Sequence, residues 1–139
     1  MTRILGLDVG DVRIGVALSD PLGFTAQRLQ VLERSGLAKD VAAVRGLIER
    51  HGAARVVIGM PLTLQGERGI QAHKVEAFAT ALERAGGVPI TFVDERLTTV
   101  QGERALRETN TRGKKRKQVI DQIAAQLILQ QYLDTARDA

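Results

Sequence analysis

The chain has 139 residues, the length of one ordinary domain that can bury a full hydrophobic core. It has no cysteine, which excludes disulfides and thiolate metal sites. A metal ion would need oxygen ligands or one of the two histidines, and oxygen is favoured. The N-terminus lacks the apolar run of a signal peptide, and no apolar run approaches the roughly 20 residues that span a bilayer. We therefore expect a soluble, cytoplasmic protein with no membrane partner.

The net charge is +4, and the positive charge is concentrated in one segment. Residues 96–117 hold eight Lys or Arg and two acids, so this segment carries +6 and the rest of the chain −2. Such a segment favours a polyanionic partner, although a solvated charge run is an equally simple interpretation. Aromatic residues make up only 3% of the chain, which favours contact with backbone phosphates over base stacking. The candidate contacts in its most basic stretch, RGKKRK, are Arg112, Lys114, Lys115, Arg116 and Lys117.

Three strands are predicted first. Residues 3–9 (RILGLDV) and 13–19 (RIGVALS) are rich in β-forming residues and are separated by a Gly-containing turn, which predicts a hairpin. A third strand is expected within residues 24–32 and completes an antiparallel meander.

The register of this hairpin decides which side chains share a face. With a two-residue loop at 10–11, Asp8 would pair with Arg13 and Gly6 with Gly15. Asp8 would then share a face with the two glycines, which leave room for something to approach. The opposite face would be apolar, formed by Leu5, Leu7, Val9, Ile14, Val16 and Leu18.

Helices and strands then alternate. Apolar residues at helical spacing predict a helix after Ser35, a candidate N-cap, and Gly52 stands where a left-handed C-terminal glycine is typical. The later elements are a strand at 54–59, a helix around 75–82 ended by Gly86-Gly87, a strand at 88–93, a short helix capped by Thr98 and Gln101, and an amphipathic helix over 119–128.

The element order β-β-β-α-β-α-β-α predicts an α/β fold, with a mixed five-stranded sheet flanked by helices in a single domain over residues 1–139. Right-handed crossovers would make the two later strands parallel to the first. Their carboxyl ends would then share the edge at which α/β sheets bind ligands. Asp8 ends the first strand and Asp94-Glu95 follows the last, so this edge collects acids.

Carboxylates gathered at one edge repel each other unless a cation lies between them. Mg²⁺ is the simplest such cation, and two ions about 3.5–4 Å apart would stabilise both oxygens of a phosphodiester displacement. Asp121 is the third acid we choose, because it would lie in the first turn of the last helix, where the helix dipole favours a carboxylate.

Each acid also has a simpler interpretation. Asp8 could form an ion pair across the hairpin, and Asp121 could be an ordinary helix-start residue. Asp94 or Glu95 could pair with Arg96 or cap the next turn. Since adjacent residues alternate faces, only one of these two acids is expected to point inward.

Four stretches carry a resemblance to a known family. These stretches are GLDVGDVRIGVALSD, VVIGMPLTLQG, FVDERLTT and VIDQIAAQLILQQYL, spread along the chain from Gly6 to Leu133. They resemble the YqgF/RuvX family of the ribonuclease H-like superfamily. The resemblance implies the ribonuclease H-like fold and metal-dependent nuclease chemistry. Carried over position by position, it implies Asp8, Glu95 and Asp121 as the catalytic metal ligands.

By the same resemblance, Arg13 and Arg96 match basic positions of the family motifs and are candidates for phosphate or transition-state contacts. Thr63 departs from the family pattern, which usually has Asn after GMPL, although a hydroxyl can still donate to a phosphate.

The main hypothesis is an endonuclease that uses Mg²⁺ or Mn²⁺, with two ions expected, on structured nucleic acid. The family is described both as a Holliday-junction resolvase and as a nuclease that matures the 5′ end of precursor 16S rRNA, so RNA and DNA both stay open. A resolvase would need two active sites in a homodimer, whereas a processing nuclease could act as a monomer. We expect a flexible basic loop over residues 110–117 that closes over the phosphate backbone.

Two alternatives belong to other classes. A nucleic-acid-binding ribosome-assembly factor with little turnover would need only the basic segment. An ATP-utilising kinase of the actin-like kind would suit the DVGDVRIG stretch, but that fold needs two such domains and this length supplies one.

Overall fold

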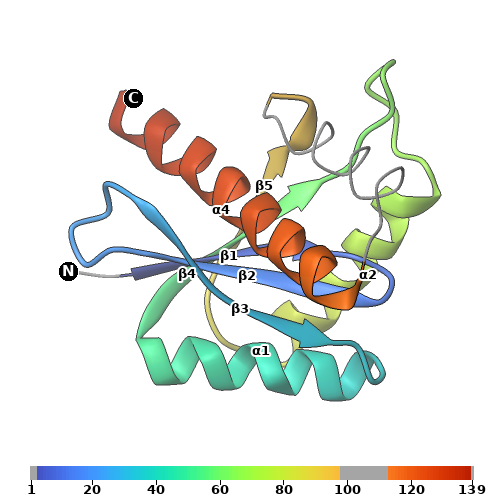
Figure 1. The fold of residues 1–139 in the computed structure, drawn as a ribbon, viewed down its shortest axis with the longest axis horizontal. Coiled ribbons are helices and arrows are strands. Elements are labelled where there is room, and N and C mark those ends of the chain that lie inside the picture. Colours follow the sequence, from blue (N-terminus) through green and yellow to red (C-terminus); the bar gives the residue numbers. More distant parts are fainter. Residues whose placement is uncertain (1–2, 98–112, 139) are drawn as a thin grey trace.

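The computed structural model describes residues 3–97 and 113–138 (Figure 1). In chain order its elements are β1 (Arg3–Val9), β2 (Arg13–Ser19), β3 (Ala26–Glu33), α1 (Leu37–His51), β4 (Ala53–Met60), α2 (Ile70–Arg84), β5 (Ile90–Asp94), the short 3₁₀ helix η1 (Glu95–Leu97) and α4 (Lys114–Asp138). In the part of the chain that the structure describes, no helix is long and apolar enough to cross a membrane.

The five strands form one mixed sheet in the order β3-β2-β1-β4-β5. β2 runs antiparallel to both β1 and β3, whereas β1, β4 and β5 are parallel. This is the predicted meander followed by parallel crossovers, and the predicted fold class is confirmed. The carboxyl ends of β1, β4 and β5 therefore lie along one edge of the sheet.

The register of the first hairpin differs from the prediction by two residues. Leu7 lies opposite Val16 and Asp8 opposite Gly15, so the predicted pairing of Asp8 with Arg13 is wrong. The reason is a longer turn at residues 10–12, in which the N–H of Gly10 donates to the carbonyl of Arg13 at 3.0 Å. Because strand side chains alternate with a period of two, a two-residue shift leaves the predicted faces unchanged.

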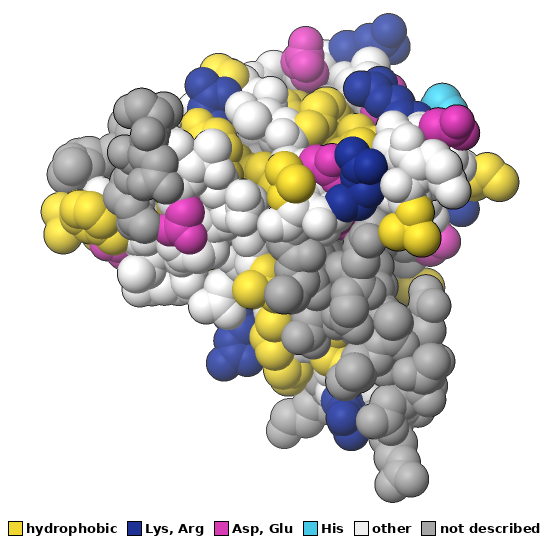
Figure 2. Space-filling view, turned by 90° about the horizontal axis from the view of Figure 1, so that it is seen from above, with side chains coloured by type: hydrophobic (Ala, Val, Ile, Leu, Met, Phe, Trp, Pro, Cys, Tyr) yellow, Lys and Arg dark blue, Asp and Glu magenta, His cyan; other side chains and the backbone are white. Residues whose placement is uncertain are grey.

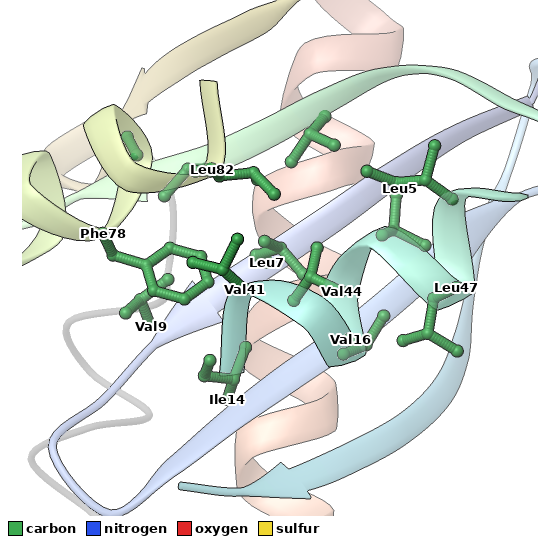
Figure 3. Close-up of a cluster of buried hydrophobic side chains, with 14 of the residues drawn as sticks. Leu5, Leu7, Val9, Ile14, Val16, Val41, Val44, Leu47, Phe78 and Leu82 are labelled. Carbon is green, nitrogen blue, oxygen red and sulfur yellow. The ribbon is translucent and has the colours of Figure 1, made fainter. Parts of the chain in front are cut away.

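The apolar face of this hairpin packs against α1 and α2 to form the main hydrophobic core. Phe78 of α2 is the largest of the fully buried side chains. Figure 3 shows the strand residues meeting the helices at Leu5, Leu7, Val9, Ile14, Val16, Val41, Val44, Leu47, Phe78 and Leu82.

The other face of the sheet is covered by α4 (Figure 1), whose buried side chains pack on Ala17, Val57 and Val93. Glycines in the strands let this helix come close. A Cβ added at Gly6 would lie 2.7 Å from the Cβ of Leu129, and one added at Gly15 would collide with the main-chain carbonyl of α4. The two glycines therefore leave room for α4 itself.

The start of α4 differs from the prediction. The helix begins at Lys114 rather than near residue 119, so residues 114–117 are helical and do not belong to a loop. Because Lys and Arg are good helix formers, the helix extends beyond the apolar pattern that predicted it. Asp121 consequently lies about two turns inside the helix, so its predicted first-turn position is wrong. The helix dipole does not account for this acid, because dipole effects fade beyond the first turn.

Other boundaries shift by a few residues. Gly36 rather than Ser35 precedes α1, and no side chain caps this helix end, whereas Gly52 adopts the predicted left-handed conformation. β5 begins at Ile90, two residues later than predicted. The predicted cap of Thr98 and Gln101 lies outside the described residues.

Candidate active site at the carboxyl edge of the sheet

Asp8 is the buried acid at the end of β1, with 1% of its surface exposed. Its partner on β2 is Gly15. On the other side, Leu7 pairs with Ile58 of β4, so the next residue of β4, Gly59, adjoins Asp8 at the edge of the sheet. Asp8 thus has a glycine on both sides, on the face that α4 covers.

Asp121 of α4 lies over one of these glycines. Its main-chain carbonyl is the group that a Cβ on Gly15 would meet first. The residue is 2% exposed, and its Oδ2 accepts a hydrogen bond from Nε of Arg13 at 2.7 Å. Because Gly15 is the cross-strand partner of Asp8, the chain brings these two acids to neighbouring positions.

Glu95 lies over the other glycine. It follows β5 directly, in η1, and is fully buried. Its Oε1 would be 2.6 Å from a Cβ added at Gly59. Any side chain at this position of β4 would therefore push into the space that Glu95 occupies.

The three acids that the sequence singled out are thus all buried on one face, over three adjacent strands. Buried negative charge is costly unless a positive charge compensates it, and Arg13 supplies such a charge to Asp121. Their donor set is all oxygen, which suits a hard divalent cation. Across residues 3–97 and 113–138, however, no three acids or histidines already form a compact metal-binding group. A cation would have to draw the carboxylates together.

Asp94 lies in a different environment from its buried neighbour Glu95. Its carboxylate forms a bidentate ion pair with Arg96, with Nη2 at 2.7 Å and Nε at 3.1 Å, and also accepts the backbone N–H of Arg96. The guanidinium group lowers the pKa of Asp94, and the carboxylate in turn raises the pKa of Arg96. Of the two adjacent acids, one is buried and the other is paired toward solvent, as the alternation of faces predicts.

Arg96 also lies close to the loop between β4 and α2. Its Nη1 lies 3.1 Å from the position of a Cβ on Gly66, where φ is +82°. Thr63 closes this loop by accepting the N–H of Glu67 on its hydroxyl at 3.1 Å and the N–H of Gly66 on its carbonyl at 2.9 Å. Thr63 therefore has a structural role in the PLTLQG loop.

With this geometry in place, comparison with known proteins decides the family. Residues 2–135 match the RuvX family, described as Holliday junction resolvase. The chain belongs to the RuvX family. The resemblance seen in the sequence is confirmed, and membership assigns the chain to the nucleases, which hydrolyse phosphodiester bonds of nucleic acid.

Curated relatives of this RuvX member are similar over nearly their whole length. A Moorella thermoacetica protein is 52% identical over 132 residues, which cover 95% of this chain and 94% of the relative. A Gloeobacter violaceus protein is 49% identical over 137 residues, which cover 99% and 86%. Both carry the name "Putative pre-16S rRNA nuclease".

Solved structures share the fold of this RuvX chain at low identity. RuvC of Thermus thermophilus, bound to a Holliday junction substrate, has a TM-score of 0.63 at 16% identity, with 99% of this chain and 96% of that chain covered. The Fowlpox virus resolvase, also with Holliday junction DNA, has a TM-score of 0.51 at 11% identity, with 97% and 99% covered. These likenesses establish the fold.

The basic residues predicted for this RuvX chain are only partly visible. Arg116 is exposed and Lys117 half-buried at the start of α4, whereas Arg112 and the side chains of Lys114 and Lys115 lie outside the described part. In Figure 2, coloured Lys and Arg side chains lie among acidic and hydrophobic ones on the face shown. The described residues of this face thus form no continuous basic patch.

Sequence reasoning missed one buried acid, Asp40 of α1, which is 4% exposed and pairs with Arg34 at 2.9 Å. The signal was present, because Asp40 stands four residues before Val44 on the apolar stripe of the predicted helix. An acid on such a stripe needs a partner.

Proposed function

We propose that this chain is an endonuclease that depends on Mg²⁺ or Mn²⁺, in a single domain over residues 1–139. Asp8, Glu95 and Asp121 would hold two divalent ions. The observation that carries the proposal is the burial of these three carboxylates on one face, where Asp121 and Glu95 lie against two strand glycines, Gly15 and Gly59. When bound, the ions would supply an activated water and neutralise charge on the phosphate that is attacked.

The chain's own residues would orient this site. Arg13 holds the Asp121 carboxylate through Nε and compensates its charge. The ion pair of Asp94 with Arg96 fixes the start of η1, so that Glu95 is directed inward. Arg96 and the residues at the start of α4 would contact substrate phosphates.

The proposed substrate is structured nucleic acid, with the 5′ extension of precursor 16S rRNA first and the four-way DNA junction second. The names of the relatives at 52% and 49% identity support the RNA, and the family description supports the junction. The chain would act in the cytoplasm, as a monomer on rRNA or as a homodimer on a junction, where two strands must be cut.

The test is a side-by-side cleavage assay of a 5′-extended rRNA precursor and a four-way junction, with Mg²⁺, Mn²⁺ or EDTA. We expect Asp8→Asn to reduce cleavage at least ~100-fold and to leave nucleic-acid binding largely intact. Loss of a metal ligand should weaken the site more than loss of a residue that only hydrogen-bonds to a ligand, which typically costs roughly 10–100-fold. Glu83→Gln, which removes an exposed acid on α2, is the matched control and should cleave normally. Full activity of Asp8→Asn, or of the wild type in EDTA, contradicts the proposal.

A second candidate is a nucleic-acid-binding assembly factor with little turnover. It is favoured by the lack of a compact three-ligand group among the described residues together with the basic segment. It predicts salt-dependent binding and no metal-dependent product from either substrate. Catalytic turnover of either one excludes it.

A further inference from the structure

We call Asp8, Glu95, Asp121 and Arg13 the carboxylate site. The buried acid Asp40 belongs to a contact network outside it. Its Oδ2 accepts Nε of Arg34 at 2.9 Å, and its Oδ1 accepts the N–H of Ser35 at 2.9 Å. Burial raises the pKa of Asp40, but these two donors outweigh it and hold the pKa below its ordinary value. The carboxylate is therefore ionised at neutral pH and fixes the guanidinium group.

Arg34 connects three parts of the fold. Besides Asp40 of α1, its guanidinium carbon lies 5.6 Å from the ring centre of Phe78 of α2, in cation–π range. Its Nη1 donates to the carbonyl of Gly10 at 3.0 Å, and its backbone N–H donates to the carbonyl of Val12 at 2.9 Å. One side chain thus ties the turn between β1 and β2 to both helices of the main core.

This turn separates two residues of the carboxylate site. Asp8 lies two residues before Gly10, and Arg13 follows the turn. Gly10 links the two contacts, because its carbonyl accepts Nη1 of Arg34 and its N–H donates to the carbonyl of Arg13. Arg13 then holds Asp121 at 2.7 Å. Hydrogen bonds therefore connect Asp40 of α1 to Asp121 of α4 through three intervening residues, Arg34, Gly10 and Arg13.

We propose that Arg34, held by Asp40, is a positioning residue that fixes the β1–β2 turn and thereby the Arg13 side chain. The inference rests on the proposed function, since what it positions is the metal-binding carboxylate set. A merely structural role would use the same contacts only to stabilise the fold. The positioning role predicts that Arg34 variants change the Arg13 Nε–H signal and the metal affinity even where they are as stable as control variants. The merely structural role predicts neither change.

The first measurement tests the positioning without metal. In the NMR spectrum of the wild type, the Nε–H of Arg13 should give a protected signal because it donates to Asp121. Arg34→Gln and Asp40→Asn should weaken that protection at least about tenfold, since Gln cannot contact both Gly10 and Asp40. Leu47→Ala, which destabilises the same core away from the turn, should preserve it. An unchanged Arg13 signal in Arg34→Gln overturns the proposal.

The second measurement is Mn²⁺ binding by calorimetry on the folded full chain. Removal of an outer partner of a metal ligand typically weakens affinity 10–100-fold, and we expect about tenfold for Arg34→Gln and less for Arg34→Lys, which keeps the charge. Asp11→Asn is the matched control, because it breaks the exposed ion pair of the same turn with Lys74 and should leave affinity unchanged. Equal affinities of Arg34→Gln and wild type contradict the proposal.

The two measurements separate the two proposals. A wild type that binds no Mn²⁺ but whose Arg13 signal depends on Arg34 refutes the proposed metal site and retains the positioning of Arg13. A wild type that binds Mn²⁺ with an Arg13 signal independent of Arg34 does the reverse. In the double variant Arg34→Gln/Arg13→Gln, the decrease in affinity should be smaller than the sum of the two single decreases, because both act through the same hydrogen bond.

Discussion

At the scale of single residues, two adjacent acids have opposite environments. Glu95 is fully buried over Gly59, whereas Asp94 is engaged by Arg96 through three side-chain hydrogen bonds. A carboxylate already satisfied by a bidentate guanidinium is a poor metal ligand, because the ion would have to displace the arginine. The metal ligand should therefore be Glu95, and Asp94 should orient Arg96.

These environments predict different effects of neutralising each acid. Glu95→Gln should abolish Mn²⁺ binding and cleavage, because a carboxamide carries no charge to offer a divalent ion. Asp94→Asn should retain Mn²⁺ affinity within about threefold and should raise the KM for nucleic acid more than it lowers kcat, since Arg96 is no longer anchored. Calorimetry and steady-state cleavage measure both quantities. The reverse order, with Asp94→Asn abolishing metal binding, would make Asp94 the ligand.

The sequence predicted the contrast between these two acids but not the partner of Arg13. Alternation of faces after a strand requires only local geometry, and residues 94 and 95 follow it. The partner of Arg13 depends on the length of the turn, which the residues Gly10-Asp11 alone do not fix. It also depends on where α4 crosses the sheet, a tertiary contact between residues 108 positions apart.

At the scale of secondary-structure elements, the approach of α4 to the sheet determines where Asp121 lies. The helix crosses the strands at glycine positions, with its main chain against Gly15. A backbone carbonyl cannot move aside as a flexible side chain can. The spacing between β2 and α4 is therefore fixed by the absence of a Cβ.

Replacing this glycine should be costly. Gly15→Ala should lower the free energy of unfolding by about 1–3 kcal/mol, because the added methyl group forces α4 away from β2. Gly46→Ala is the matched control: nothing lies within 4 Å of a Cβ at this exposed site of α1, and alanine should stabilise the helix by roughly 0.5–1 kcal/mol. Urea unfolding measures both. A Gly15→Ala variant as stable as the wild type would show that α4 can shift freely.

Element positions were predictable where apolar periodicity marks packing. The strands, the helix ended by Gly52 and the buried part of α4 all follow from such patterns. The first turns of α4 did not, because residues 114–117 are polar helix formers outside the packed stripe. The pattern reports where a helix is buried, and a helix can begin earlier.

At the scale of the whole molecule, the two faces of the sheet are covered by different helices and bury different kinds of residues. α1 and α2 cover the hydrophobic core on one face, and α4 covers the acids on the other (Figure 1). Contacts of nucleic acid with the acids should therefore involve charges on the α4 side. Charges on α1 and α2 should matter less, since they lie across the sheet and are screened over about 8–10 Å at physiological salt.

This asymmetry predicts the salt dependence of binding. Replacing Lys114, Lys115, Arg116 and Lys117 by Gln should reduce the slope of log affinity against log salt by roughly 0.7–0.9 for each phosphate that the protein no longer neutralises. Substitution is preferable to deletion, because these residues begin α4 and Gln preserves a helix. The control with equal charge change replaces four exposed residues of α1 and α2, Lys39, Arg45, Arg50 and Arg84, by Gln. Equal slopes for the two variants would show that nucleic acid binds elsewhere on the surface.

The early start of α4 has a geometric consequence for where a strand would be cut. Lys117 precedes Asp121 by one helical turn, a rise of about 6 Å, and the helix begins about 10 Å before Asp121. If Asp121 holds a metal ion, as we propose, this continuous helix would fix the distance between the basic residues at its start and the bond that is cleaved. At about 3.4 Å per nucleotide step of a duplex, that distance would correspond to an offset of two to three nucleotides between the contacted phosphates and the cleavage site.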